Sequence, residues 1–67
     1  METFKERLKD LREEKELSQR ELGRSIGVEN TNIARWENGT QDITSKNIIK
    51  LALFFDVTAG YLLGLEN

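Results

Sequence analysis

Apolar residues recur at helical spacing along most of this chain. Phe4, Leu8 and Leu11 lie four and three residues apart, so they form one stripe on a segment that is otherwise charged. The same spacing returns in later segments at Leu22 and Ile26, at Ile33 and Trp36, and at Ile48, Leu51, Ala52 and Phe55. No segment alternates apolar and polar residues as a half-buried strand does. The pattern predicts an all-α fold, with short helices around one small core.

Capping residues predict where a second helix begins and ends. Ser18 is a good N-cap, and Glu21 three residues later completes a capping box. Gly27 suits a left-handed residue at the helix C-terminus, where the chain must turn. Gly23 lies where the next helix must cross closely, because a larger side chain there would separate the two backbones. A third helix follows, from about Glu29 to Glu37.

Similar signals predict the remaining boundaries. Asn38 and Gly39 stop the third helix, and Thr44 or Ser45 caps a fourth. Asp56 ends the fourth helix, and Thr58 can cap a short fifth one. The residues expected to pack back on the core before Gly64 are Tyr61, Leu62 and Leu63. The chain is therefore interpreted as a single five-helix domain spanning residues 1–67.

The outer face of the third helix carries side chains suited to the edges of bases. An Arg side chain can fork onto guanine, an Asn side chain can pair doubly with adenine, and Thr offers a methyl group to thymine. These residues are Asn30, Thr31, Asn32 and Arg35. Two short helices joined by a tight turn, with the second exposed, make a helix-turn-helix. The segment from Leu17 to Gly39 therefore predicts recognition of DNA in the major groove.

The negative net charge argues against DNA binding, but the positions of the charges along the chain weaken that argument. The net charge is −2 and the sequence pI is about 5.1, whereas nucleic-acid domains are more often basic. Six of the twelve acidic residues precede Leu17. The segment between Leu17 and Thr40 contains equal numbers of the two charges, three Arg and three Glu. Attraction to phosphate is local, over a Debye length of roughly 8 Å. The acidic balance nevertheless supports an alternative function, a protein-interaction module of the antirepressor or antitoxin-like kind.

The composition argues against an enzyme. The chain has no Cys and no His, which excludes disulfides, the usual zinc sites and His-based catalysis. It shows no nucleophile–base pair and no glycine-rich phosphate loop, and it is short for enclosing a pocket. We therefore expect no cofactor, no metal and no small-molecule ligand. No apolar run approaches the ~20 residues that span a bilayer, so we expect a cytoplasmic location and no membrane partner.

Three segments together resemble a known family. They are FKERLKDLREEKELSQRELG, GVENTNIARWENG and the closing YLLG. The chain is similar over essentially its whole length to the Cro and phage-repressor type of helix-turn-helix regulators, the XRE family. The block LSQ-x-EL, G-V and I-A-R-W-E-N-G carries the specificity of this resemblance. It implies a compact five-helix domain that binds double-stranded operator DNA, usually as a dimer, and represses or tunes transcription.

The resemblance also implies roles for individual residues. The four polar residues of the third helix fall on the positions that the family uses for the major groove. The phosphate-contacting set would be Ser18, Gln19, Arg20, Asn38, Gly39, Thr40 and Lys46. Of these, Ser18 and Gln19 start the second helix, where free N–H groups and the positive dipole end face a phosphate. Arg20 lies outward, where it either touches phosphate or is merely solvated. Trp36 is expected in the core rather than as a platform on which bases stack.

Arg12 and Glu37 match a buried ion pair seen in relatives. A bidentate Arg–carboxylate contact would stabilise such a buried pair. Losing one partner would leave an unpaired buried charge, which is energetically costly. The alternative is that both residues are solvated surface charges.

The chain departs from the family pattern at three places. Glu16 replaces the Gly that commonly ends the first helix, so that turn must find another geometry or accept strain. Ile43 stands where Pro is common. The turn from Thr40 to Asp42 lacks the Lys or Arg often found there, and Lys46 is expected to compensate.

The fourth helix is apolar beyond its core face. Ile49 and Leu53 form a second stripe beside the first. This stripe either packs under the fifth helix or forms a subunit interface shared with Tyr61 and Leu65. The second interpretation predicts a weak homodimer, or a dimer that forms only on DNA.

Overall fold

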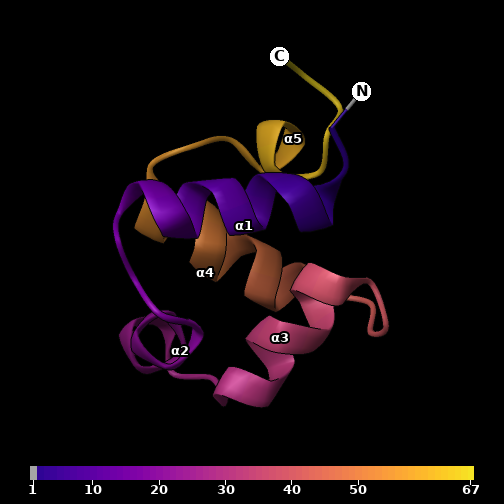
Figure 1. Cartoon of the computed structure of the whole chain (residues 1–67). Coiled ribbons are helices and arrows are strands. Elements are labelled where there is room, and N and C mark those ends of the chain that lie inside the picture. The colour runs from indigo at the N-terminus through magenta and orange to yellow at the C-terminus, as the bar shows by residue number, and fades with distance from the viewer. Residues whose placement is uncertain (1) are drawn as a thin grey trace.

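Five α-helices make up the computed structural model, which describes residues 2–67 (Figure 1). They are α1 (Phe4–Glu14), α2 (Gln19–Ile26), α3 (Asn30–Asn38), α4 (Ser45–Phe55) and α5 (Ala59–Leu62). No strand occurs between residues 2 and 67. The all-α, five-helix prediction is confirmed, and the helix boundaries differ from the expected ones by about one residue.

The capping signals act as the sequence predicts. The Ser18 hydroxyl accepts a hydrogen bond from the Glu21 backbone N–H at 3.0 Å, and the Glu21 carboxylate accepts one from the Ser18 N–H at 2.8 Å. Hydrogen bonds from Ser18 lower the pKa of Glu21, with the larger effect from the Ser18 backbone and the smaller one from its hydroxyl. Gly27 ends α2 with a φ of 76°. Of the two candidate caps for α4, Thr44 holds the position, because its hydroxyl accepts from the Asn47 N–H.

The turn after α1 accepts strain. Glu16 adopts a φ of 56°, in the left-handed region that favours glycine. This conformation lets the Leu17 N–H donate to the Arg12 carbonyl at 3.1 Å, which closes the C-terminal turn of α1. The turn therefore keeps the geometry of a glycine-terminated helix with a residue that is poorly suited to it.

The core draws at least one residue from every helix. Leu8, Leu22, Ile33, Leu51 and Leu62 are fully buried, and Trp36 lies among them. Trp36 is therefore a core residue, as expected. The expectation for the chain end is only partly correct, because Leu63 is 41% exposed while Leu62 is buried. Successive residues of a helix point about 100° apart, so the short α5 directs one of them inward and its neighbour away.

The second apolar stripe of α4 stays uncovered. Ile49 is 57% exposed and Leu53 is 77% exposed, although α5 follows directly in the chain and contacts α4. The alternative in which this stripe packs under α5 is therefore wrong. Leu65 is also exposed, whereas Tyr61 is half-buried.

Arg7 fastens the end of the chain to α1. Its side chain is buried, and it donates hydrogen bonds to the carbonyl oxygens of Tyr61, at 2.7 Å, and of Glu66. Its guanidinium also lies 4.2 Å from the centre of the Tyr61 ring. The C-terminal tail consequently lies beside α5 and the residues before α1, at the end of the molecule opposite α2 and α3 (Figure 1).

Candidate nucleic-acid interface

The turn between α2 and α3 brings the two backbones into close contact. A Cβ at Gly23 would lie 2.6 Å from the Val28 carbonyl oxygen, so only glycine fits there without a shift. The Val28 N–H in turn donates to the Gly23 carbonyl at 2.9 Å. This contact fixes α3 against α2 and leaves one face of α3 free.

Helix α3 has one buried face and one solvent-exposed face. Ile33 and Trp36 are buried, the opposite side carries the exposed Thr31 and Arg35, and Asn30 is exposed at the N-terminal end of the helix. Thr31 and Arg35 are four residues apart and therefore share one line along the helix. Three of the four predicted base-contacting residues are thus exposed to solvent. Asn32 lies at the edge of the exposed face and is half-buried.

Gln41 bridges two of these residues, and the sequence analysis did not identify it. Its side-chain amide donates to the Asn32 side-chain oxygen at 3.1 Å, and its own oxygen accepts from the Arg35 guanidinium at 3.5 Å. No sequence motif marks this contact, because the partners lie nine and six residues apart across a turn.

Arg12 and Glu37 form the predicted ion pair. The Arg12 Nε and Nη2 atoms donate to the two oxygens of Glu37, at 2.6 and 2.9 Å. Their side chains are 12% and 5% exposed, so the alternative of two solvated surface charges is wrong. The hydrogen bond to Glu37 raises the pKa of Arg12. Arg12 also donates to the Leu17 carbonyl at 2.8 Å, which joins the pair to the turn before α2.

Gln19 extends this network to α2. Its amide donates to Glu37 at 3.1 Å, so one carboxylate on α3 holds side chains from both α1 and α2. One N–H of the amide is used inside the protein, and an amide group carries two. Gln19 therefore supports α3 from its half-buried position, and the second N–H of its amide is available to another acceptor.

The residues after α3 use most of their donors within the protein. Gly39 and Thr40 both donate their backbone N–H groups to the Arg35 carbonyl. The Thr40 N–H and hydroxyl also donate to the Asn38 side-chain oxygen, at 3.0 and 2.6 Å. Of the donors predicted to face phosphate here, the exposed Asn38 amide N–H₂ is the one suited to that role.

Lys5 lies beside this same end of α3, and the sequence analysis did not identify it either. Its Cδ and Nζ atoms lie 3.4 and 3.7 Å from the point where Gly39 would carry a Cβ. A lysine on α1 thus supplies positive charge next to a turn that has none of its own. The other predicted phosphate-contacting residues, Ser18, Arg20 and Lys46, are exposed near the starts of α2 and α4.

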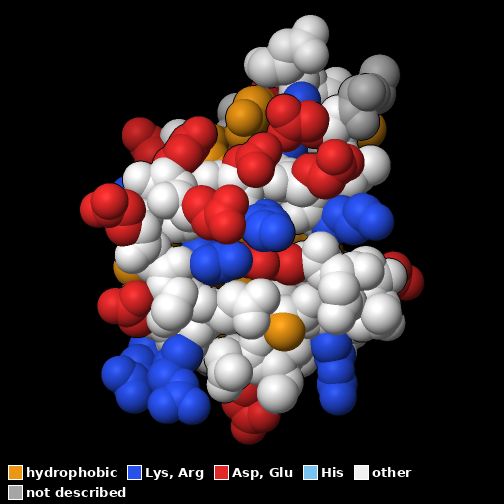
Figure 2. Space-filling model, in the orientation of Figure 1, with side chains coloured by type: hydrophobic (Ala, Val, Ile, Leu, Met, Phe, Trp, Pro, Cys, Tyr) orange, Lys and Arg blue, Asp and Glu red, His pale blue; other side chains and the backbone are white. Residues whose placement is uncertain are grey.

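The charges are unevenly distributed over the face seen in Figure 2. Acidic side chains gather over α1 with basic ones beside them, while the lower edge, near α2 and α3, carries basic groups on either side of an acidic side chain. The acidic N-terminal segment that dominates the net charge therefore lies mainly on the side away from the exposed face of α3. This distribution removes much of the objection that the low pI raises.

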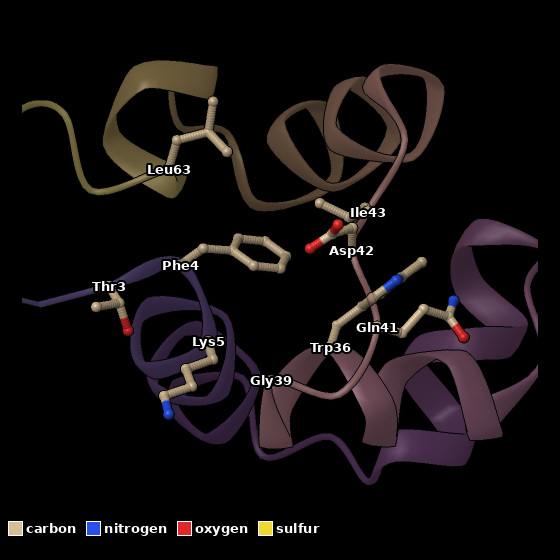
Figure 3. A pocket seen from close by; sticks show the side chains of 9 residues that line it. All are labelled: Thr3, Phe4, Lys5, Trp36, Gly39, Gln41, Asp42, Ile43 and Leu63. Atoms are coloured by element: carbon tan, nitrogen blue, oxygen red, sulfur yellow. The ribbon is translucent and has the colours of Figure 1, made fainter.

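An open cavity of about 640 Å³ lies between α1, the α3–α4 loop and α5 (Figure 3). Its apolar lining comes from Phe4, Trp36, Ile43 and Leu63. Ile43 is partly buried and packs against the core, which anchors the loop.

Among residues 2–67, no group of three or more Asp, Glu, His or Cys residues is placed to hold a metal ion. No helix there has the length and apolar character to cross a membrane.

Comparisons with known proteins agree with this geometry. Residues 8–62 match the model of the helix-turn-helix family. The chain is 37% identical over 54 residues to the cryptic phage CTXphi transcriptional repressor RstR of Vibrio cholerae. That match covers 81% of this chain and 49% of the relative, so the chain spans about half the length of the curated relative.

Solved structures give the same result. The P22 c2 repressor in complex with a synthetic operator superposes with a TM-score of 0.90 at 26% identity, over 98% of this chain and 100% of that one. The restriction-modification controller protein C.AhdI of Aeromonas hydrophila gives a TM-score of 0.81 at 34% identity, over 88% and 89% of the two chains.

Proposed function

Because the chain belongs to the XRE, phage-repressor type of helix-turn-helix family, we propose that it is a sequence-specific transcriptional repressor. It inserts α3 into the major groove of operator DNA. The observation that carries this proposal is the free face of α3, with Asn30, Thr31 and Arg35 exposed above a buried Ile33 and Trp36. The RstR relative is named a transcriptional repressor, and the P22 relative is bound to operator DNA.

Each base-contacting residue has a chemically defined partner. Arg35 donates to guanine O6 and N7, and the amides of Asn30 and Asn32 pair with adenine. Thr31 places its methyl group against thymine or its hydroxyl against another base edge. The backbone phosphates are held by the N-terminus of α2 with Ser18, Gln19 and Arg20, and by a second set at the end of α3 and the start of α4. The second set consists of Lys5, the Asn38 side-chain amide and Lys46, because Gly39 and Thr40 use their donors within the protein.

Two copies of the chain occupy one operator. A single domain with few basic residues beside α3 has modest affinity for a half-site, and pairing multiplies this affinity without new base contacts. The exposed residues Ile49, Leu53 and Leu65, with the half-buried Tyr61, form the contact between copies. This interface is small, so the copies pair weakly in solution or only on DNA. The role places the protein in the cytoplasm.

Selection of binding sites from random double-stranded DNA, followed by anisotropy titrations at two salt concentrations, tests the proposal. We expect one enriched, roughly palindromic sequence and an affinity that falls steeply with salt, because phosphate binding releases counterions. No enrichment, with no salt-dependent binding, would contradict a DNA-binding role.

The acidic surface over α1 favours a second candidate, a protein-interaction module (Figure 2). In that case the partner would bear a basic surface, and residues on the exposed face of α3 could be substituted without loss of function. Replacing Arg35 would then leave the function of the protein intact, whereas reversing the charge of Glu13 and Glu14 would abolish it.

A further inference from the structure

The base-contacting residues of α3 are not independent of the loop that follows the helix. Gln41, in the α3–α4 loop, donates from its amide nitrogen to the Asn32 side-chain oxygen at 3.1 Å. Its amide oxygen accepts from the Arg35 guanidinium at 3.5 Å. The first distance is that of an ordinary hydrogen bond, and the second is at the outer limit of one. Gln41 therefore holds Asn32 firmly and Arg35 loosely.

The loop itself is anchored on both sides of Gln41. Before it, the Thr40 N–H donates to the Arg35 carbonyl at 3.0 Å and to the Asn38 side chain. After it, Ile43 packs against the core near Trp36. In Figure 3 the Gln41 side chain extends away from Phe4, and its hydrogen bonds join it to α3. A side chain held in this way can orient its neighbour before DNA arrives.

The direction of the hydrogen bond decides what Asn32 offers to a base. Because the Asn32 oxygen faces the Gln41 N–H₂, the Asn32 amide has one defined orientation. Its nitrogen keeps both N–H donors for an acceptor such as adenine N7, and its oxygen keeps one lone pair for the adenine N6 amine. Without the bond to Gln41, the Asn32 amide would become ordered only when DNA binds. The entropy lost in that ordering would weaken the complex.

We propose that Gln41 is a positioning residue that sets the base preference of Asn32. This inference rests on the proposed DNA-binding function and adds to it a residue outside the recognition helix. Gln41 acts through Asn32 and touches no base itself. The base pair that Asn32 contacts therefore depends on a residue nine positions further along the chain.

The central variant is Gln41→Met, which keeps the length of the side chain and removes both hydrogen bonds. We expect its affinity for the best site to fall about three- to tenfold, the usual value of one ordinary hydrogen bond. Discrimination should weaken at one base pair of each half-site, while binding to random DNA and the salt dependence stay unchanged. Circular dichroism and thermal unfolding will show that the variant folds as the wild type does.

Two further variants separate positioning from other roles. Asp42→Asn is a matched control in the same loop, and removing its negative charge should strengthen binding to all DNA without changing the preferred sequence. Gln41→Glu offers only acceptors, so Asn32 must turn its nitrogen toward the carboxylate and present its oxygen to DNA. This variant should change the preferred base at that pair rather than merely weaken the preference.

A double-variant cycle completes the test. In an Asn32→Ala background, Gln41→Met should have little further effect, because the positioned side chain is gone. A full additional loss there would mean that Gln41 acts through Arg35 or contacts DNA directly, and either result overturns its positioning of Asn32. An unchanged base preference in Gln41→Met would overturn the inference and leave the proposed function standing. A wild-type protein that selects no DNA sequence would overturn both.

Discussion

Arg35 is the residue on which specificity should depend most. It is exposed on the free face of α3, and the one hydrogen bond that its side chain makes within residues 2–67, to Gln41, is long and weak. Its fork of donors is therefore available for guanine. Arg35→Ala should reduce affinity for the best site by ~1–3 kcal/mol and relax the preference at one position per half-site. Site selection with the variant measures both effects, and an unchanged sequence preference would show that Arg35 contacts only phosphate.

Glu16 is the residue where a substitution should raise stability. Its left-handed backbone costs a non-glycine residue roughly 1–2 kcal/mol. Glycine adopts this conformation freely but loses roughly 0.5–1 kcal/mol more in backbone entropy on folding. Glu16→Gly should therefore increase the free energy of unfolding by about 0.5–1 kcal/mol.

Urea titration of the purified variant checks this value. Glu14→Gly is the control, because Glu14 lies within α1 and glycine there should destabilise the helix. A Glu16→Gly variant that is less stable than the wild type would mean that the Glu16 side chain contributes more than its backbone costs.

Residues whose roles depend on local spacing were predictable, and those whose partners lie far along the chain were not. Ser18, Gly27 and Thr58 act within three or four residues of themselves, so the sequence alone predicts their capping roles. Arg7 reaches partners 54 and 59 residues away. In the sequence it is one of many charged residues on α1, and only the folded chain places it beneath Tyr61. The Arg12–Glu37 pair, at a separation of 25 residues, was predictable only from the family resemblance.

At the scale of the helices, Glu37 joins α1, α2 and α3. Its carboxylate accepts from Arg12 and from Gln19, and Arg12 also holds the turn between the first two helices. The orientation of the recognition helix therefore depends on a buried polar network as well as on apolar packing. Losing one charge of a buried pair typically costs 3–5 kcal/mol, because the other charge is left unpaired.

Arg12→Ala and Glu37→Gln should each destabilise the fold, and their effects should be strongly non-additive. The double variant should lose little more than the worse single one, because the second substitution removes the unpaired charge. A domain of this size has a total stability of only a few kcal/mol. Unfolding titrations in sucrose, which favours the compact state, should keep the single variants measurable. Effects that add within a few tenths of a kcal/mol would indicate two independent side chains.

At the scale of the whole molecule, we propose that the uncovered stripe of α4 and the C-terminal tail form one contact surface between copies. Leu53 and Ile49 on α4 are exposed, and α5 with the fastened tail lies next to α4. This region is separate from the free face of α3, so a second copy could bind there without blocking DNA. Helix α4 was predictable from its periodicity, but which of its two stripes stays exposed depends on how α5 packs.

Leu53→Glu should abolish cooperative binding and leave the fold intact. Leu53 is 77% exposed, so the change costs the single domain little, whereas a buried carboxylate at a contact between copies is strongly unfavourable. Half-sites about one helical turn apart, ~34 Å, would then be filled independently. Anisotropy titrations on full and half operators measure the cooperativity. Leu63→Glu adds the same charge at an exposed leucine outside the proposed contact, and it should remain cooperative. Non-cooperative binding of the wild type to an asymmetric site, unaffected by Leu53→Glu, would refute the dimer.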